Sequence, residues 1–147
     1  MRKIAVVASL LAMAFPMMAV AQTAPKVKHS PAKYTSPTSG KEMFQAYCTP
    51  CHGPNGKGNG PAATAMKVPP ADLTRLAAKY KGVFPDMEVA EALRAGPTPS
   101  SNNTSHGSET MPVWGPVFRN LSGHTDDAMA ELRIHNLVEY VKGIQEK

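Results

Sequence analysis

The two cysteines of this 147-residue chain stand three positions apart, within the run Cys48-Thr49-Pro50-Cys51-His52. Two thiols about one helical turn apart can each add to one of the two vinyl groups on the edge of a porphyrin. The imidazole that follows the second thiol then lies under the ring and can bind its iron. The spacing is typical of covalent attachment of haem c, with Cys48 and Cys51 as the anchors and His52 as an axial ligand.

Three other kinds of site could use the same residues. A structural zinc site needs four ligands, and the chain has no second pair of cysteines. A redox-active dithiol is expected in a β-α-β setting, which the sequence does not predict. A disulfide between Cys48 and Cys51 would suit an oxidising compartment but would leave His52 unexplained. One covalently attached haem c per chain is therefore the favoured interpretation.

A second axial ligand has to come from elsewhere in the chain, and Met111 is favoured. Pro112 follows it, and a proline pushes the preceding residue away from helical angles, so Met111 is expected on an extended loop that can reach across the ring. His106 is the main competitor. Trp114 is expected to pack near the haem or in the core. The weaker candidates are the other histidines and methionines: His29, His124, His135, Met43, Met66, Met87 and Met129.

The elements that must position these residues are predicted to be helices joined by long loops. Thr38 or Ser39 is expected to cap a first helix that carries the attachment motif. On that helix, apolar and cysteine side chains recur at steps of three and four and share one face. The chain from residue 53 to residue 70 is dense in glycine and proline and is predicted to be loop.

Three further helices are predicted after this loop. Asp72 is expected to cap a short helix that reaches Tyr80, and a third helix is predicted over residues 86–95. Residues 97–110 form a long polar loop, which an apolar segment, residues 113–118, follows. Thr125 is expected to cap the last helix, whose apolar stripe comprises Ala130, Ile134, Leu137, Val138, Val141 and Ile144. With no strand pattern, the fold class is all-α, with about four to five helices.

The amino terminus is typical of a secretory signal peptide. Arg2 and Lys3 precede an apolar run that ends at Ala21, after which the mature chain would begin. The run is also just long enough for an uncleaved membrane anchor. Export of a haem c protein points to a bacterial periplasm. Residues 22–38 are rich in Pro, Ser, Thr and Lys and are predicted to be a disordered leader, so the domain is expected to span residues 39–147.

The composition excludes several classes of function. Hydrophobic residues make up 42% and charged residues 18%, which is ordinary for a soluble globular protein. The glycine-rich nucleotide motifs and the serine-hydrolase motif are absent from the sequence. The formal net charge is +5, and +3 without the basic pair at positions 2 and 3. This small excess does not argue for nucleic acid and fits weak docking on acidic partner surfaces.

With these residues the chain resembles the class I, His/Met-ligated monohaem c-type cytochromes over most of the stretch from Gly40 to Gln145. Gly40 and Phe44 stand where that family has the glycine and aromatic residue of its first helix. Leu137 and Tyr140 stand where its last helix has a leucine and an aromatic residue. The resemblance implies a cytochrome c fold wrapped around the haem, in which these two helices cross closely at the glycine.

The resemblance also implies roles for residues around the haem. Met111-Pro112 matches the ligand motif. Gly60-Pro61 resembles the Gly-Pro that follows the haem loop, which implies that the carbonyl of Pro61 accepts a hydrogen bond from the His52 imidazole. Arg75 and Arg94 could pair with haem propionates, although solvated helix faces suit either one better.

The function implied is one-electron transfer by an iron that cycles between Fe(II) and Fe(III), rather than enzymatic catalysis. Two protein ligands leave no open coordination position for a substrate. The expected role is a soluble periplasmic carrier whose partners are redox proteins: a dehydrogenase, an oxidase or a reductase. An alternative is a fixed haem c subunit of a larger membrane or periplasmic oxidoreductase. A more remote alternative is a ligand-binding or peroxide- or NO-reactive haem protein with an open iron.

Overall fold

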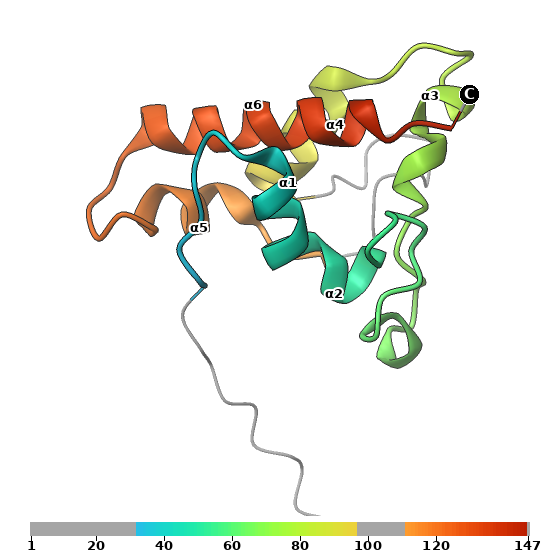
Figure 1. The fold of residues 1–147 in the computed structure, drawn as a ribbon, viewed down its shortest axis with the longest axis horizontal. Coiled ribbons are helices and arrows are strands. Elements are labelled where there is room, and N and C mark those ends of the chain that lie inside the picture. Colours follow the sequence, from blue (N-terminus) through green and yellow to red (C-terminus); the bar gives the residue numbers. More distant parts are fainter. Residues whose placement is uncertain (1–31, 97–110, 147) are drawn as a thin grey trace, which may run out of the picture. The chain divides into compact units, whose positions relative to one another are not determined.

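The computed structural model describes residues 32–96 and 111–146, so the predicted signal peptide, most of the predicted leader, His29 and His106 lie outside the described residues. Within these ranges every regular element is helical and no strand occurs, which confirms the all-α prediction. The longest element is α6 (Asp127–Gly143), and α1 (Gly40–Met43), α4 (Asp86–Ala95) and α5 (Trp114–Asn120) pack against it (Figure 1). None of the helices in these ranges is long and apolar enough to cross a membrane.

The attachment motif lies on a helical run that changes its winding twice. Ser39 caps α1, as predicted, because its side chain accepts a hydrogen bond from the Glu42 amide. The run then widens into a π-helical turn, η1 (Phe44–Cys48), in which the amide of Thr49 donates to the carbonyl of Phe44. It ends in α2 (Thr49–His52). The motif is therefore held on continuous helix, with one locally wider turn just before it.

The first and last helices cross closely at Gly40, as the resemblance implies. A Cβ atom at Gly40 would collide with the backbone carbonyl of Asn136 in α6. One turn further along, the rings of Phe44 and Tyr140 lie 5.1 Å apart between their centroids. Only a residue without a side chain allows this approach, which is the physical reason for glycine at this position.

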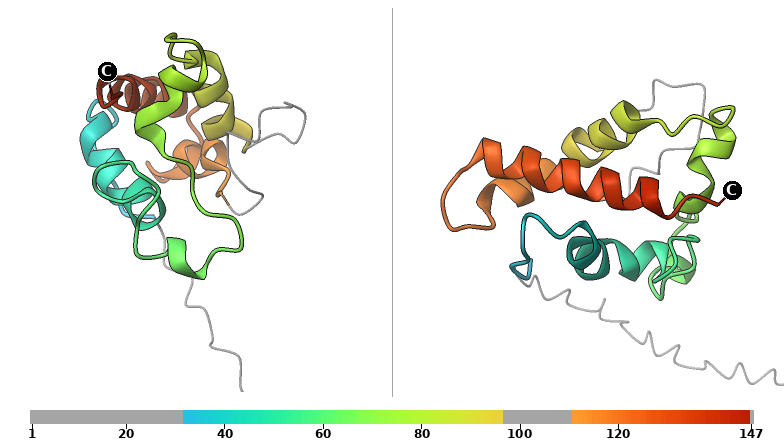
Figure 2. Two further views of the ribbon diagram at one scale, coloured as in Figure 1. Left: turned by 90° about the vertical axis from the view of Figure 1, so that its right-hand side faces the viewer. Right: turned by 45° about the horizontal axis from the view of Figure 1, so that its top comes forward.

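The middle of the chain forms shorter elements. The loop after α2 contains a single turn, η2 (Ala63–Ala65), and the predicted helix at Asp72 begins as a 3₁₀ turn, η3 (Leu73–Arg75), before α3 (Leu76–Lys79). Asp72 caps this segment, as predicted, by accepting from the Thr74 amide. The helix α4 has the predicted bounds. Figure 2 shows α4 on the opposite side of α6 from α1 and α2, and α3 near the carboxyl end of α6.

One prediction about the carboxyl-terminal part is wrong. Asp126, not Thr125, caps α6, because the Asp126 carboxylate accepts from the Met129 amide at 2.9 Å. A carboxylate at this position also complements the helix dipole. The apolar segment after Met111, for which no element was predicted, folds into α5, whose Pro116 lies in the first turn, where its missing N–H costs nothing. The stripe predicted for α6 is buried as far as Val141, and Ile144 lies just beyond the helix end.

The predicted leader also ends too late. Residues Lys33–Thr38, which we call the N-terminal strap, lie against the body of the domain. Thr35 is only 1% exposed, the Tyr47 hydroxyl donates to the Lys33 carbonyl at 2.5 Å, and the Asn136 side-chain amide donates to the Pro37 carbonyl at 3.0 Å. The composition of this stretch resembles a disordered segment, but these tertiary hydrogen bonds order it.

Candidate functional site

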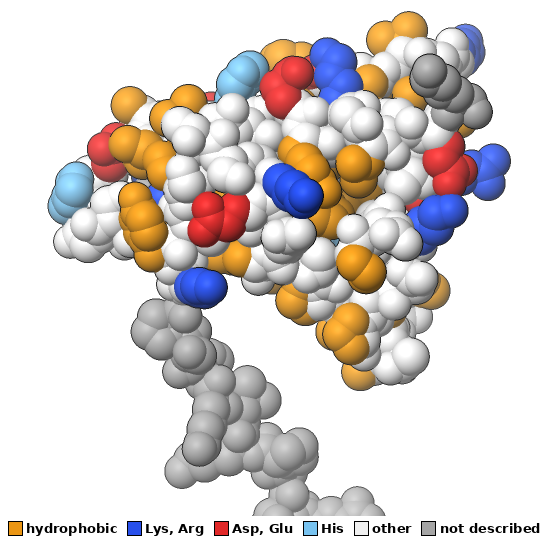
Figure 3. Space-filling model, viewed as in Figure 1, with side chains coloured by type: hydrophobic (Ala, Val, Ile, Leu, Met, Phe, Trp, Pro, Cys, Tyr) orange, Lys and Arg blue, Asp and Glu red, His pale blue; other side chains and the backbone are white. Residues whose placement is uncertain are grey.

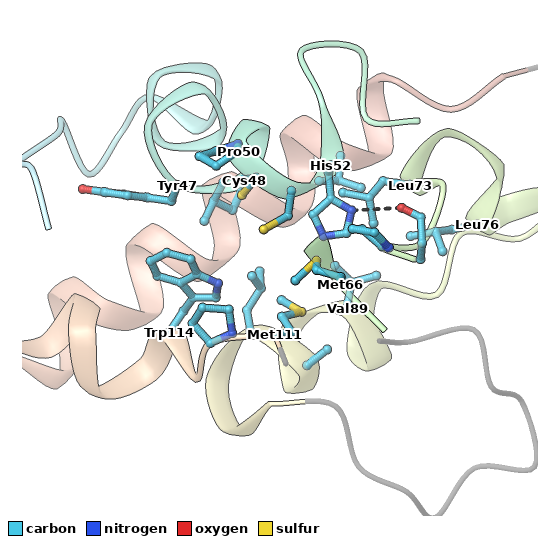
Figure 4. Close-up of a pocket in the computed structure, with 18 residues that line it drawn as sticks. Tyr47, Cys48, Pro50, His52, Met66, Leu73, Leu76, Val89, Met111 and Trp114 are labelled. Carbon is cyan, nitrogen blue, oxygen red and sulfur yellow. Dashed lines mark hydrogen bonds between the residues drawn. The ribbon is translucent and has the colours of Figure 1, made fainter. Parts of the chain in front are cut away.

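The attachment motif faces a cavity of about 280 Å³. Side chains from η1, α2, α3, α4, α5 and α6 line it, together with the loop between α2 and η3, and nearly all of them are apolar (Figure 4). An apolar cavity of this kind suits a flat hydrophobic cofactor better than a polar metabolite.

Both cysteines of the motif lie in the cavity wall as free thiols. The wide turn η1 brings two sequence neighbours, Tyr47 and Cys48, into the same wall, and α2 adds Cys51 and His52. Neighbouring residues of both helical turns thus line the cavity together.

The glycine-rich loop after the motif folds back on the backbone of α2. The amide of Gly58 donates to the His52 carbonyl at 2.8 Å, and the amide of Gly60 donates to the Cys51 carbonyl at 2.9 Å. The amide of Ala62 donates to the Pro50 carbonyl at 2.9 Å. The last carbonyls of a helix have no partner within it, so these three bonds complete the helix end and hold the motif rigidly.

The His52 ring is oriented by Ala71 and not by Pro61, so this implication of the resemblance is wrong. The Nδ1–H group of His52 donates to the Ala71 carbonyl at 2.9 Å, while the Pro61 carbonyl accepts from the Thr64 hydroxyl. A carbonyl oxygen only accepts, so Nδ1 carries the hydrogen and the lone pair lies on Nε2. The sequence holds a signal for this acceptor in Pro69-Pro70, which forces extended chain just before Ala71.

Burial changes the protonation of two residues of the motif. Desolvation lowers the pKa of His52, and the hydrogen bond to Ala71 only partly opposes this change. A neutral imidazole is the form that binds a metal. Desolvation, with a smaller contribution from Cys51, raises the pKa of the Cys48 thiol to about 12. A redox-active dithiol needs the opposite shift, so this environment does not favour thiol–disulfide exchange.

Of the described candidates for the second axial ligand, two lie in the cavity wall. These are Met111, just before α5, and Met66, on the loop after η2. Figure 4 shows both side chains facing the cavity near His52. The other described candidates lie elsewhere: Met43 is in the core, Met87, His124 and His135 are exposed, and Met129 is not in the wall. Nothing in the sequence favours Met66 as a ligand, because it is the return of the loop after α2 that brings this residue to the cavity.

Trp114 lies in the cavity wall beside Tyr47, with 5.3 Å between the two ring centroids. The buried ring of Phe118 stacks on Trp114, with 5.6 Å between the two ring centroids. The two arginines considered for propionates lie on the surface. Arg94 forms ion pairs with Glu91 and Glu131, and Arg75 is exposed.

A family model described as cytochrome c oxidase, cbb3-type, subunit III matches residues 35–132, which is two thirds of the chain. The chain belongs to this family of c-type cytochrome domains. A search of curated proteins found no match. As a cytochrome c domain, the protein carries covalently bound haem c and functions in electron transfer.

The residues of the cavity fit this cofactor. Two free thiols lie one helical turn apart, a neutral imidazole has its Nδ1–H group engaged, and two thioethers face the same apolar space. Thiols, imidazole and thioether are the groups that attach haem c and ligate its iron. The match also begins at Thr35, within the N-terminal strap, in agreement with the ordered structure of that segment.

Proposed function

We propose that Cys48 and Cys51 attach the haem and that His52 and Met111 are its axial ligands. The observation that carries this proposal is the convergence of both thiols, the oriented imidazole and the Met111 thioether on one apolar cavity. Met111 is preferred to Met66 because Pro112 and the start of α5 fix the backbone next to Met111.

The residues of this chain then tune an electron carrier. When bound, the haem supplies an iron that exchanges a single electron. The Ala71 carbonyl keeps the proton of His52 on Nδ1 and so makes Nε2 a better donor. The Met111 thioether is a soft ligand that favours the ferrous state and raises the potential. Trp114, Tyr47 and Leu137 exclude water from the cavity, which also favours the state of lower charge.

We further propose that the protein is an exported, soluble carrier. The signal-like amino terminus supports export to the periplasm, where haem c is attached. Charged side chains of both signs are interspersed over the face seen in Figure 3, rather than gathered in one patch. Docking with redox partners is therefore expected to be weak, brief and sensitive to salt.

A second candidate is a fixed haem subunit of a larger oxidoreductase. The description of the matching family model, an oxidase subunit, favours it. Native mass measurement on cell extract separates the two roles. A particle of monomer size supports the carrier, whereas co-migration with a large complex supports the subunit.

Optical redox titration of the purified protein tests the site. The expected result is a one-electron transition and, in the ferric state, the near-red absorption band of iron bound to thioether sulfur. A ferric protein without this band that binds carbon monoxide once reduced would instead support the open-iron alternative.

A further inference from the structure

Arg133 is a buried, charged residue that the proposed haem site does not use. This arginine of α6 is 0% exposed. Its Nη1 group donates to the Thr35 carbonyl at 2.9 Å and to the Thr35 hydroxyl at 3.1 Å. Among the residues that the structure describes, none accepts from its Nε or Nη2 group, and no carboxylate forms an ion pair with it.

The surroundings of Arg133 leave its charge uncompensated. The exposed ring of Tyr34 lies 5.3 Å from the guanidinium carbon, and the Met43 sulfur lies 3.8 Å from Nη1. These groups are neutral, and a guanidinium stays charged in proteins. A buried charge without a counter-ion costs free energy, so its presence calls for a reason other than stability.

Arg133 lies one helical turn from the cavity. Leu137 and Val141, four and eight residues further along α6, both line the cavity, so Arg133 continues the same face of the helix. Arg133 does not line the cavity itself, but its place on this helix face, one turn before Leu137, is inside the protein.

A hydrogen-bonded chain also joins Arg133 to the wall. The single proton of the Tyr47 hydroxyl goes to the Lys33 carbonyl, so the Thr35 hydroxyl has to donate to Tyr47, at 2.8 Å. The Thr35 oxygen in turn accepts from Arg133. The donors of this chain therefore run from the Arg133 guanidinium through the Thr35 and Tyr47 hydroxyls to the Lys33 carbonyl. Tyr47 itself lines the cavity.

We propose that Arg133 is a positioning and tuning residue that raises the reduction potential of the haem through its buried charge. The inference rests on the proposed haem site. The ferric state carries one more positive charge than the ferrous state, so a cation close by in a poorly screened interior disfavours oxidation. The N-terminal strap keeps water from this charge and thereby preserves its effect.

The test compares midpoint potentials of the full holoprotein. Arg133→Met and Arg133→Gln both remove the charge, and glutamine keeps a donor toward Thr35. We expect each to raise the ferric-to-ferrous ratio at a fixed electrode potential several-fold, because one positive charge is lost from a poorly screened interior. The shift should persist at high salt.

Two control variants separate charge from structure. Arg119→Met removes a charge from an arginine whose side chain is 43% exposed, and it should leave the potential unchanged at high salt. Thr35→Val breaks the hydrogen-bonded chain but retains the charge, and it should also leave the potential unchanged. A fall in potential with Thr35→Val, or none with Arg133→Gln, would overturn the inference.

The readouts also distinguish this inference from the haem site on which it rests. Haem staining after denaturing electrophoresis and the near-red band report the site, and both should be retained in Arg133→Gln. If the wild-type protein itself lacked either signal, the proposed site would fail. If both signals were retained while the potential did not move, only the role of Arg133 would fail.

Discussion

The cavity has two sides that are built in different ways. On the attachment side, residues 40–62, the thiols and His52 sit on one helical run whose end is completed by amides of the following loop. On the Met111 side, residues 111–120, the proposed ligand is held by contacts with distant parts of the chain. Gly115 lies against the Arg94 carbonyl of α4, and Trp114 packs on Tyr47. Local interactions thus position the proposed covalent anchors, and tertiary packing positions the proposed sixth ligand, Met111.

The largest effect is expected on the attachment side. The double variant Cys48→Ala, Cys51→Ala should lose all covalent haem, because no other cysteine exists in the chain. Haem staining after denaturing electrophoresis measures this loss. Pro50→Ala, which keeps both thiols and the loop amides, is the matched control and should stain like the wild type. A stained double variant would place the haem elsewhere.

The Met111 side should respond with a change of ligation rather than a loss of haem. Met111→Ala should abolish the near-red band and lower the midpoint potential, on the order of 100 mV within the roughly 0.8 V that axial ligands span. Spectra and potentiometry measure both effects. Met66→Leu is the matched control, since Met66 faces the same cavity. If Met66→Leu removed the band and Met111→Ala did not, the two methionines would exchange roles.

The helix crossing that supports the attachment side gives the next largest effect. Gly40→Ala should lower the free energy of unfolding by about 2–3 kcal/mol, because the new Cβ meets the backbone of α6. Gly143→Ala, at the end of α6 with open space around it, should be neutral or slightly stabilising. Urea unfolding of both holoproteins makes the comparison. Equal stabilities would show that the crossing is looser than the structure indicates.

The smallest effect concerns the turn that presents the Ala71 carbonyl. Asp72→Ala should cost about 1 kcal/mol of unfolding free energy through loss of the cap on η3. Although partial desolvation opposes it, hydrogen bonds from Thr74 hold the pKa of Asp72 below its ordinary value of 3.8. The contribution of the Asp72 carboxylate to the free energy of unfolding is therefore complete at a pH above its ordinary pKa. It is lost as the pH falls through the lowered pKa of the folded protein.

Urea unfolding at pH 7 and near pH 3 measures this dependence. The difference between Asp72→Ala and wild type should shrink at the acidic pH. Asp127→Ala, an exposed first-turn residue of α6 that is not its cap, is the control and should change the stability little at either pH. A difference for Asp72→Ala that grew on acidification would contradict the assigned pKa direction.

The contrast between local interactions and tertiary packing also explains which features could be predicted from the sequence. The attachment motif, the Ser39 and Asp72 caps and the bounds of α4 depend on residues close together in sequence, and the structure agrees with each predicted element. The helix crossing at Gly40 followed from the resemblance, because the residues on both helices matched the family.

Features that depend on tertiary contacts were not predictable in this way. The strap has the composition of a disordered segment, and tertiary contacts with Tyr47, Asn136 and Arg133 order it. The acceptor for His52 is Ala71 rather than Pro61, a choice made by the path of the loop between them. The helix α5 contains Gly115 and Pro116, which locally argue against a helix but are accommodated by close packing on α4 and by a place in the first turn.

Peptide mass analysis of the purified, exported protein tests the central claim most directly. Trypsin cleavage after Lys41 and Lys57 releases the peptide Glu42–Lys57, which contains both thiols and His52. We predict that this peptide carries the added mass of one haem and has no thiol that reacts with an alkylating reagent. A peptide of unmodified mass with two alkylated cysteines would contradict the account.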